Sequence, residues 1–186
     1  LNKAKIHISL AEAYARSGNM DLALEEFNQY NMELLRLKDL EGYCRSGLNI
    51  AEALIDQGSL GRADSLLNKI IPVAAEFGNT ELEAYANLLT GKSKSSARNF
   101  TQAIPYYRKA FRSLEKNESR VIVDCANAYL KTLAETKGSE EARSVMASPV
   151  LQQYIRQCTN KERLDYLKAS IHFRWNSYSL AELQAY

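Results

Sequence analysis

The chain has 186 residues, of which 46% are hydrophobic and 25% are charged, and its formal net charge is +2. This composition is that of a folded globular protein and excludes an intrinsically disordered chain. A charge so close to zero argues against direct nucleic-acid or membrane partners, and no apolar run approaches the roughly 20 residues of a membrane span.

Apolar residues at helical spacing predict a series of helices joined by short turns. Beyond Gly138 a shorter helix is expected to end or break at Pro149, because proline does not fit a helix interior. A capping signal at Thr159 and Glu162 predicts a last helix through about Trp175. The sequence therefore predicts an all-α protein, with its main helices at 4–17, 20–37, 40–57, 60–77, 80–97, 100–115 and 120–136.

These helices form a repeat that recurs at a constant step. The tripeptide at positions 10–12 aligns with those at 50–52 and 90–92, as Leu-Ala-Glu, Ile-Ala-Glu and Thr-Gly-Lys. Two antiparallel helices approach closely only where side chains are small, and larger apolar residues fill the remaining space. The sequence therefore predicts helix hairpins, each held by a pair of small residues twelve positions apart: Ala11 and Ala23, Ala51 and Ala63, Gly91 and Ala103.

Turn residues recur between the helices of each hairpin. Gly18 and Gly58 are expected to take a positive φ and so to end the first helix. Asn19 and Ser59 follow them directly. Their side-chain oxygens are expected to cap the second helix.

This pattern resembles the tetratricopeptide repeat, which has a small residue in each helix, a large apolar residue three positions after the first, and glycine at the turn. The unit here, of about 40 residues, is longer than the standard unit of about 34 residues. It is similar to a subclass found in Pins-type polarity scaffolds, in sensor domains of maltose-activator-type bacterial regulators and in repeat subunits of large assemblies. The resemblance implies one right-handed superhelical solenoid of four to five repeats, at about 4–43, 44–83, 84–118, 119–149 and 160–186, the last matching weakly.

The resemblance also implies a concave face, built from the first helix of each hairpin, that binds a peptide or protein segment. Acidic residues near its start and basic residues further along favour a ligand whose charges follow a fixed order. Only Asn49 matches the carboxylate clamp of chaperone-binding repeats, and only Asn127 matches the asparagines of polarity scaffolds, so neither target preference is transferred. The implied partner-binding residues are Ile8, Glu12, Arg16, Arg45, Asn49, Glu52, Asp56, Tyr85, Leu89, Lys92, Arg120, Asp124, Asn127 and Lys131.

The sequence lacks the residue patterns that are typical of catalytic and metal-binding sites. His7 is expected to be a packed core residue, and Glu140 with Glu141 a solvated face. The three cysteines, Cys44, Cys125 and Cys158, lack metal or redox spacing and are expected to be buried free thiols. No catalytic residue, metal site or cofactor is therefore predicted.

A binding function remains, with two forms left open. The favoured one is a cytoplasmic, or alternatively nuclear, scaffold or adaptor segment, and the other is a ligand- or peptide-sensing domain of a bacterial transcription regulator. Because the chain opens with Leu1, it is expected to be a fragment of a longer protein. The aromatic segment from Ile171 to Leu180 is expected to cap the stack or to serve self-association or packing with other segments.

Overall fold

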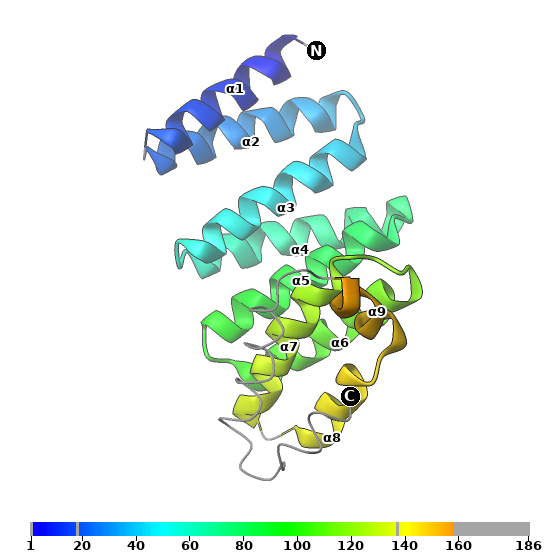
Figure 1. Ribbon diagram of the computed structural model, residues 1–186. Coiled ribbons are helices and arrows are strands. Elements are labelled where there is room, and N and C mark those ends of the chain that lie inside the picture. Colours follow the sequence, from blue (N-terminus) through cyan, green and yellow to red (C-terminus); the bar gives the residue numbers. More distant parts are fainter. Residues whose placement is uncertain (1, 18, 137, 158–186) are drawn as a thin grey trace. The chain divides into compact units, whose positions relative to one another are not determined.

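The computed structural model describes residues 2–17, 19–136 and 138–157, without the side chains of a few residues inside these ranges. Every regular element in these ranges is an α-helix (Figure 1). None of these helices is long and apolar enough to cross a membrane. The elements are α1 (Asn2–Arg16), α2 (Met20–Arg36), α3 (Leu40–Asp56), α4 (Leu60–Phe77), α5 (Thr80–Ser96), α6 (Phe100–Lys116), α7 (Ile122–Thr136), α8 (Ser139–Met146) and α9 (Pro149–Gln157).

The predicted helices agree with the observed ones to within two residues through α7, which begins at Ile122 rather than at residue 120. Pro149 was expected to end a helix, but α8 already ends at Met146 and Pro149 begins α9. Proline suits a first helical position, since the amide hydrogen that it lacks has no partner there within the helix. The helix predicted at 159–175 and the aromatic segment after it lie outside the described residues.

The turns that connect α2 through α7 have one backbone feature in common. Each has a single residue in the left-handed region, with φ of 57°, 75°, 74°, 61° and 49° in chain order. In the turn after α2, the amide of Lys38 donates to the carbonyl of Leu35 and that of Asp39 to the carbonyl of Leu34, which is the Schellman arrangement. Gly58 takes the positive φ expected of it, whereas Gly18 lies outside the described residues. Glycine occupies only two of the five left-handed positions, which are Lys38, Gly58, Gly78, Arg98 and Glu118.

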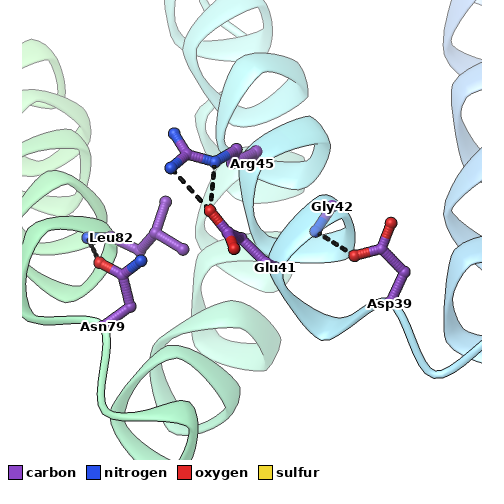
Figure 2. A network of polar contacts seen from close by, with 6 residues as sticks. All are labelled: Asp39, Glu41, Gly42, Arg45, Asn79 and Leu82. Atoms are coloured by element: carbon purple, nitrogen blue, oxygen red, sulfur yellow. Dashed lines mark hydrogen bonds and ion pairs between the residues drawn. The ribbon is translucent and has the colours of Figure 1, made fainter.

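Side-chain caps occur at the turns between hairpins. Asp39 Oδ1 accepts a hydrogen bond from the amide of Gly42 at 2.9 Å, at the start of α3 (Figure 2). Asn79 Oδ1 accepts from the amide of Leu82 at 3.1 Å, at the start of α5. These caps satisfy amides that have no partner within the helix.

Within the hairpins the predicted caps are absent. Asn19 and Ser59 do precede α2 and α4, but neither side chain bonds to the helix that it precedes. The amide group of Asn19 instead donates to Ser17 Oγ at 3.1 Å, which draws the side chain toward the preceding turn. The prediction that these side chains cap their helices is therefore wrong.

Two compact units make up the chain, and the boundary between them falls inside α5, after Leu89. In the first unit α1 packs against α2 and α3 against α4, as antiparallel pairs (Figure 1). The small residues predicted to lie at these crossings, Ala11, Ala23, Ala51 and Ala63, are fully buried. Leu67 and Ile70 of α4 are buried beside them, so the hairpin packing inferred from the sequence is confirmed. The exact repeat boundaries remain predictions.

The second unit has its core around two tyrosines. Tyr107 of α6 and Tyr129 of α7 are each 1% exposed, and their ring centroids lie 5.7 Å apart. An ideal Cβ on Gly91 would lie 2.7 Å from ring atoms of Tyr107, so only glycine leaves room for the ring. Cys125 is buried nearby, as is Cys44 in the first unit, which confirms buried free thiols at both positions. Cys158 lies outside the described residues.

Candidate partner-binding surface

One face of α3 carries four polar side chains, which we call the α3 stripe: Arg45, Asn49, Glu52 and Asp56. Successive members lie four, three and four residues apart, a spacing that places them on one side of a helix. Glu52 is half-buried and the other three are exposed. The opposite side of α3 is buried in the core of the first unit. The stripe is therefore a row of accessible donors and acceptors on a rigid element.

Arg45 is held in place at the start of the stripe. Its guanidinium donates two hydrogen bonds to Glu41 Oε1, at 3.0 Å from Nε and 2.8 Å from Nη2 (Figure 2). The Arg45 side chain is still 58% exposed. Because an exposed pair of this kind is worth less than about 1 kcal/mol, Arg45 can exchange Glu41 for a ligand carboxylate at little cost.

Tyr85 of α5 reaches the stripe from the side. Its ring packs against the core cluster of the first unit. Its hydroxyl donates a 2.7 Å hydrogen bond to Glu52 Oε2. This contact fixes the carboxylate of Glu52 and joins α5 to α3 within the first unit.

The remaining predicted residues of the first unit are placed differently. Leu89 was expected on the binding face, but it is fully buried. Its repeat counterpart Asn49 is exposed, whereas α5 is covered on nearly all sides from Leu82 to Leu89. An apolar side chain at this position therefore joins the core, and Leu89 is withdrawn from the site. Ile8 on α1 is half-buried, and the side chains of Glu12 and Arg16 lie outside what the structure describes.

A second polar row lies along α7, which we call the α7 stripe: Arg120, Asp124, Asn127 and Lys131. Arg120 stands just before the helix and the other three lie on it, at intervals of three and then four residues. Asn127 is half-buried and the others are exposed, while the opposite side of α7 is core. Lys92, on the part of α5 that belongs to the second unit, is half-buried. Each unit thus presents its own set of the predicted residues.

A polar network that the sequence pattern did not predict joins α6, α7 and α8. Arg108 donates to both carboxylate oxygens of Glu141, from Nε at 2.5 Å and from Nη2 at 2.9 Å. Tyr129 donates its hydroxyl to the same carboxylate. Hydrogen bonds from Arg108 hold the pKa of Glu141 below its ordinary value, and burial raises the pKa of Tyr129.

Two expectations about charged residues are thereby corrected. Glu141 is not part of a solvated face, because a bidentate ion pair holds it to a residue 33 positions earlier. His7 is not a core residue either, since it is half-buried and its Nδ1 lies 2.7 Å from Glu26 Oε2. In the part of the chain that the structure describes, no three histidine, cysteine or acidic side chains gather as metal ligands.

The helices define a class of fold, the all-α solenoid of helix hairpins. No protein-family model and no curated protein matches the chain. Solved structures match it closely in fold, each at 15% sequence identity or less.

RapI in its apo form matches with a TM-score of 0.84 at 15% identity, over 98% of this chain and 50% of that one. A Rap protein complexed with competence and sporulation factor matches with a TM-score of 0.76 at 15% identity, over 99% and 51%. Aspartyl phosphate phosphatase F from Bacillus subtilis matches with a TM-score of 0.78 at 13% identity, over 95% and 46%. At these identities the likeness shows the fold, and the chain spans about half the length of the solved chains that it matches.

Proposed function

We propose that this chain is a binding module that holds a protein or peptide segment on the exposed polar face of α3, and that α7 of the second unit carries a separate candidate surface. The observation that carries the proposal is the α3 stripe. Arg45, Asn49, Glu52 and Asp56 present a cation, an amide and two carboxylates in one row, on a helix whose other side is core. Rigid elements position such groups with little entropic loss when a ligand binds.

The groups of the α3 stripe suit a polypeptide ligand. Asn49 can donate to and accept from a peptide backbone at the same time, since its amide has both functions. Asp56 and Glu52 offer charge-assisted hydrogen bonds to a basic side chain, and Arg45 offers them to an acidic one. Each such bond contributes about 1.5–3 kcal/mol when it is shielded from water.

One of the solved structures supports a binding function. One of the matching Rap structures is a complex with competence and sporulation factor, so a protein of this fold holds a partner of that kind. In the chain described here, the reactive-looking group of Arg108, Tyr129 and Glu141 is explained by the packing of three helices. We therefore assign no catalytic role to it, and a cytoplasmic location is part of the same proposal.

Charge reversal tests the assignment of the α3 stripe as the binding surface. A peptide selected from a displayed random library against the chain serves as the ligand, and its affinity is measured by calorimetry. Glu52→Lys and Arg45→Glu should each weaken binding at least about tenfold, a loss of about 1.4 kcal/mol. Glu25→Lys and Lys69→Glu reverse exposed charges on α2 and α4 and should leave the affinity unchanged. Unchanged binding in both test variants would refute the surface assignment.

A second candidate is a sensing domain that reports the bound segment to other parts of a longer polypeptide. It is suggested by the matching Rap protein that is complexed with competence and sporulation factor, a chain of which this one covers 51%. A transcription-regulator context draws no support from these matches. Thermal-shift screening against peptides and small molecules tests the small-molecule form of this candidate, because a sensor for a small molecule is stabilised by that molecule and by no peptide.

A further inference from the structure

Basic residues line the exposed face of α6. Lys109, Arg112 and Lys116 follow one another at intervals of three and four residues, which places them on one side of the helix, and each is exposed. Arg108 lies one turn before Arg112, at the edge of the same face. We call these four residues the α6 row. The one acidic residue of α6, Glu115, is half-buried, so the exposed positions of this helix carry positive charge alone.

The repeat shows that this charge is not a requirement of the fold. One repeat step of 40 residues matches positions 109, 112 and 116 to positions 69, 72 and 76 of α4, and a second step matches them to positions 29, 32 and 36 of α2. All of these positions are exposed. The residues there are Lys69, Pro72 and Glu76 in α4, and Gln29, Met32 and Arg36 in α2. The fold thus exposes this face in each hairpin, and among the three helices only α6 has a basic residue at every position.

The second unit as a whole is also basic. It has 16 basic and 9 acidic residues, a net charge of +7, whereas the first unit has 8 basic and 13 acidic residues, a net charge of −5. This opposition is hidden in the net charge of +2 of the whole chain. The charge of the second unit therefore adds to the local attraction of the α6 row for an anionic partner.

A carboxylate from a neighbouring helix already occupies one end of the α6 row. Arg108 donates two hydrogen bonds to Glu141 of α8, at 2.5 Å and 2.9 Å. The pKa of Glu141 is lowered chiefly by these hydrogen bonds, and the charge of Arg112 contributes to the same effect. The guanidinium groups of the α6 row are thus placed to hold a glutamate side chain that projects from a helix.

We propose that the α6 row is a docking surface for an acidic segment of a partner protein, presented as a helix whose carboxylates recur at intervals of three and four residues. Such a segment offers one carboxylate each to Lys109, Arg112 and Lys116, because the rise between charges is then the same in both helices. Exposed ion pairs are individually weak, so the α6 row sets the orientation and the association rate of the partner more than its affinity. This surface goes beyond the α3 stripe, which belongs to the other unit.

The dimensions of the α6 row favour a polypeptide over a nucleic acid. With a rise of 1.5 Å per residue, the row spans about 10 Å along the helix axis between Lys109 and Lys116. Nucleic-acid sites commonly neutralise about 6–10 phosphates, which requires more cations than this row has. The negative net charge of the first unit also disfavours a long polyanion.

Amide NMR signals test the proposal in the 186-residue chain. The probe is a synthetic, alanine-rich helical peptide with glutamates at positions i, i+3 and i+7. At low salt it should shift the signals of α6 with a Kd on the order of 1 mM, as expected for a few exposed ion pairs. A peptide of the same composition with its glutamates spread around the helix is the matched ligand control, and it should bind at least about threefold more weakly.

Charge reversal within the α6 row identifies the surface. Arg112→Glu combined with Lys116→Glu should weaken binding of the acidic peptide at least about tenfold, because two attractions become repulsions. Lys69→Glu combined with Arg156→Glu, at exposed positions of α4 and α9, changes the net charge by the same amount. This matched control should weaken binding less than about threefold, since neither residue belongs to the row. All four side chains are exposed, so both double variants should keep the fold of the parent.

Three results would overturn the proposal. One is a parent chain whose α6 signals do not respond to the acidic peptide. Another is an equal loss of binding in the two double variants, which shows that net charge and not the α6 row attracts the peptide. The third is a single-stranded oligonucleotide, or a vesicle with anionic lipid, that binds the α6 row more tightly than the peptide does, because the surface then belongs to another class of partner.

Discussion

The hydroxyl of Tyr85 donates a 2.7 Å hydrogen bond to Oε2 of Glu52, and this bond joins α5 to α3 at the edge of the α3 stripe. The Tyr85 ring is anchored in the core, so the bond transmits the rigidity of the core to a carboxylate on the candidate binding surface. A ligand that takes the Glu52 carboxylate must share it with this hydroxyl or displace it.

Tyr85→Phe should therefore lower the stability of the first unit. The variant keeps the packed ring and loses one hydrogen bond, so the free energy of unfolding should fall by about 1 kcal/mol. Urea unfolding measures this loss. In a double-mutant cycle with Glu52→Ala, the interaction free energy between the two substitutions should be about 0.5–1.5 kcal/mol. Additive losses would mean that the hydroxyl and the carboxylate do not interact in solution.

Three turns place a side chain where glycine is preferred. Lys38, Arg98 and Glu118 have φ of 57°, 61° and 49°. This region costs non-glycine residues about 1 kcal/mol. Each substitution to glycine should stabilise its unit by about 0.5 kcal/mol, since the more flexible unfolded chain offsets part of the gain. The shift in the urea concentration at the midpoint of unfolding measures this gain in stability.

The reverse substitutions, from glycine to alanine at the other left-handed positions, are the controls for the glycine variants. Gly58→Ala and Gly78→Ala, at φ of 75° and 74°, place a side chain in the same backbone region and should destabilise the first unit. A loss of stability in all three glycine variants would contradict the argument.

The hairpin architecture could be predicted from the sequence because close helix crossings demand small residues at fixed positions. Ala11, Ala51 and Gly91 each mark such a crossing, and all three are buried. A requirement that recurs in each hairpin is visible without knowledge of the partner helix.

The features that the sequence did not reveal depend on contacts between distant residues. Leu89 shares a repeat position with Asn49, and only the extra cover over α5 turns that position from surface into core. Glu141 pairs with Arg108 because α8 packs against α7 beside α6, which no local spacing encodes. The left-handed residues other than glycine were missed because the Schellman bonds, and not the residue type, hold those turns.

Gly91 and Gly61 should respond to alanine in opposite ways. An added methyl group at Gly91 would lie 2.7 Å from the buried ring of Tyr107. The free energy of unfolding of Gly91→Ala should therefore fall by about 1 to about 2 kcal/mol, even though alanine favours a helix. At Gly61 on α4 the methyl group meets nothing within 4 Å. Gly61→Ala should stabilise the chain by up to about 1 kcal/mol, and urea unfolding measures both changes.

A second substitution identifies the neighbour that excludes the methyl group. Tyr107→Leu reproduces the pairing of Ala51 with Leu67, so Gly91→Ala should cost less on that background. An undiminished cost there would show that a residue other than Tyr107 is responsible.

The ion pair of Arg108 with Glu141 should make the second unit sensitive to acid. The pKa of Glu141 is lowered in the folded chain, chiefly by the hydrogen bonds from Arg108. A lowered carboxylate pKa adds stability that is complete above the unfolded-state value of about 4.3 and is lost as the pH falls through the folded-state value.

Glu141→Gln should remove this acid-dependent part. The side chains of Arg108 and Glu141 are 43% and 31% exposed. Solvent screening therefore limits the contribution of the pair to about 1 kcal/mol at neutral pH. Urea unfolding between pH 3 and pH 7 should show the variant less stable than the parent at pH 7, with the difference narrowing below about pH 4.

Glu140→Gln, at the exposed neighbouring position, is the matched control for this pH series and should keep the acid profile of the parent. It removes one carboxylate from the same helix while leaving the bonds between Arg108 and Glu141 in place. A difference between Glu141→Gln and the parent that stays constant across the whole pH range would mean that Glu141 acts through packing and that its charge contributes nothing.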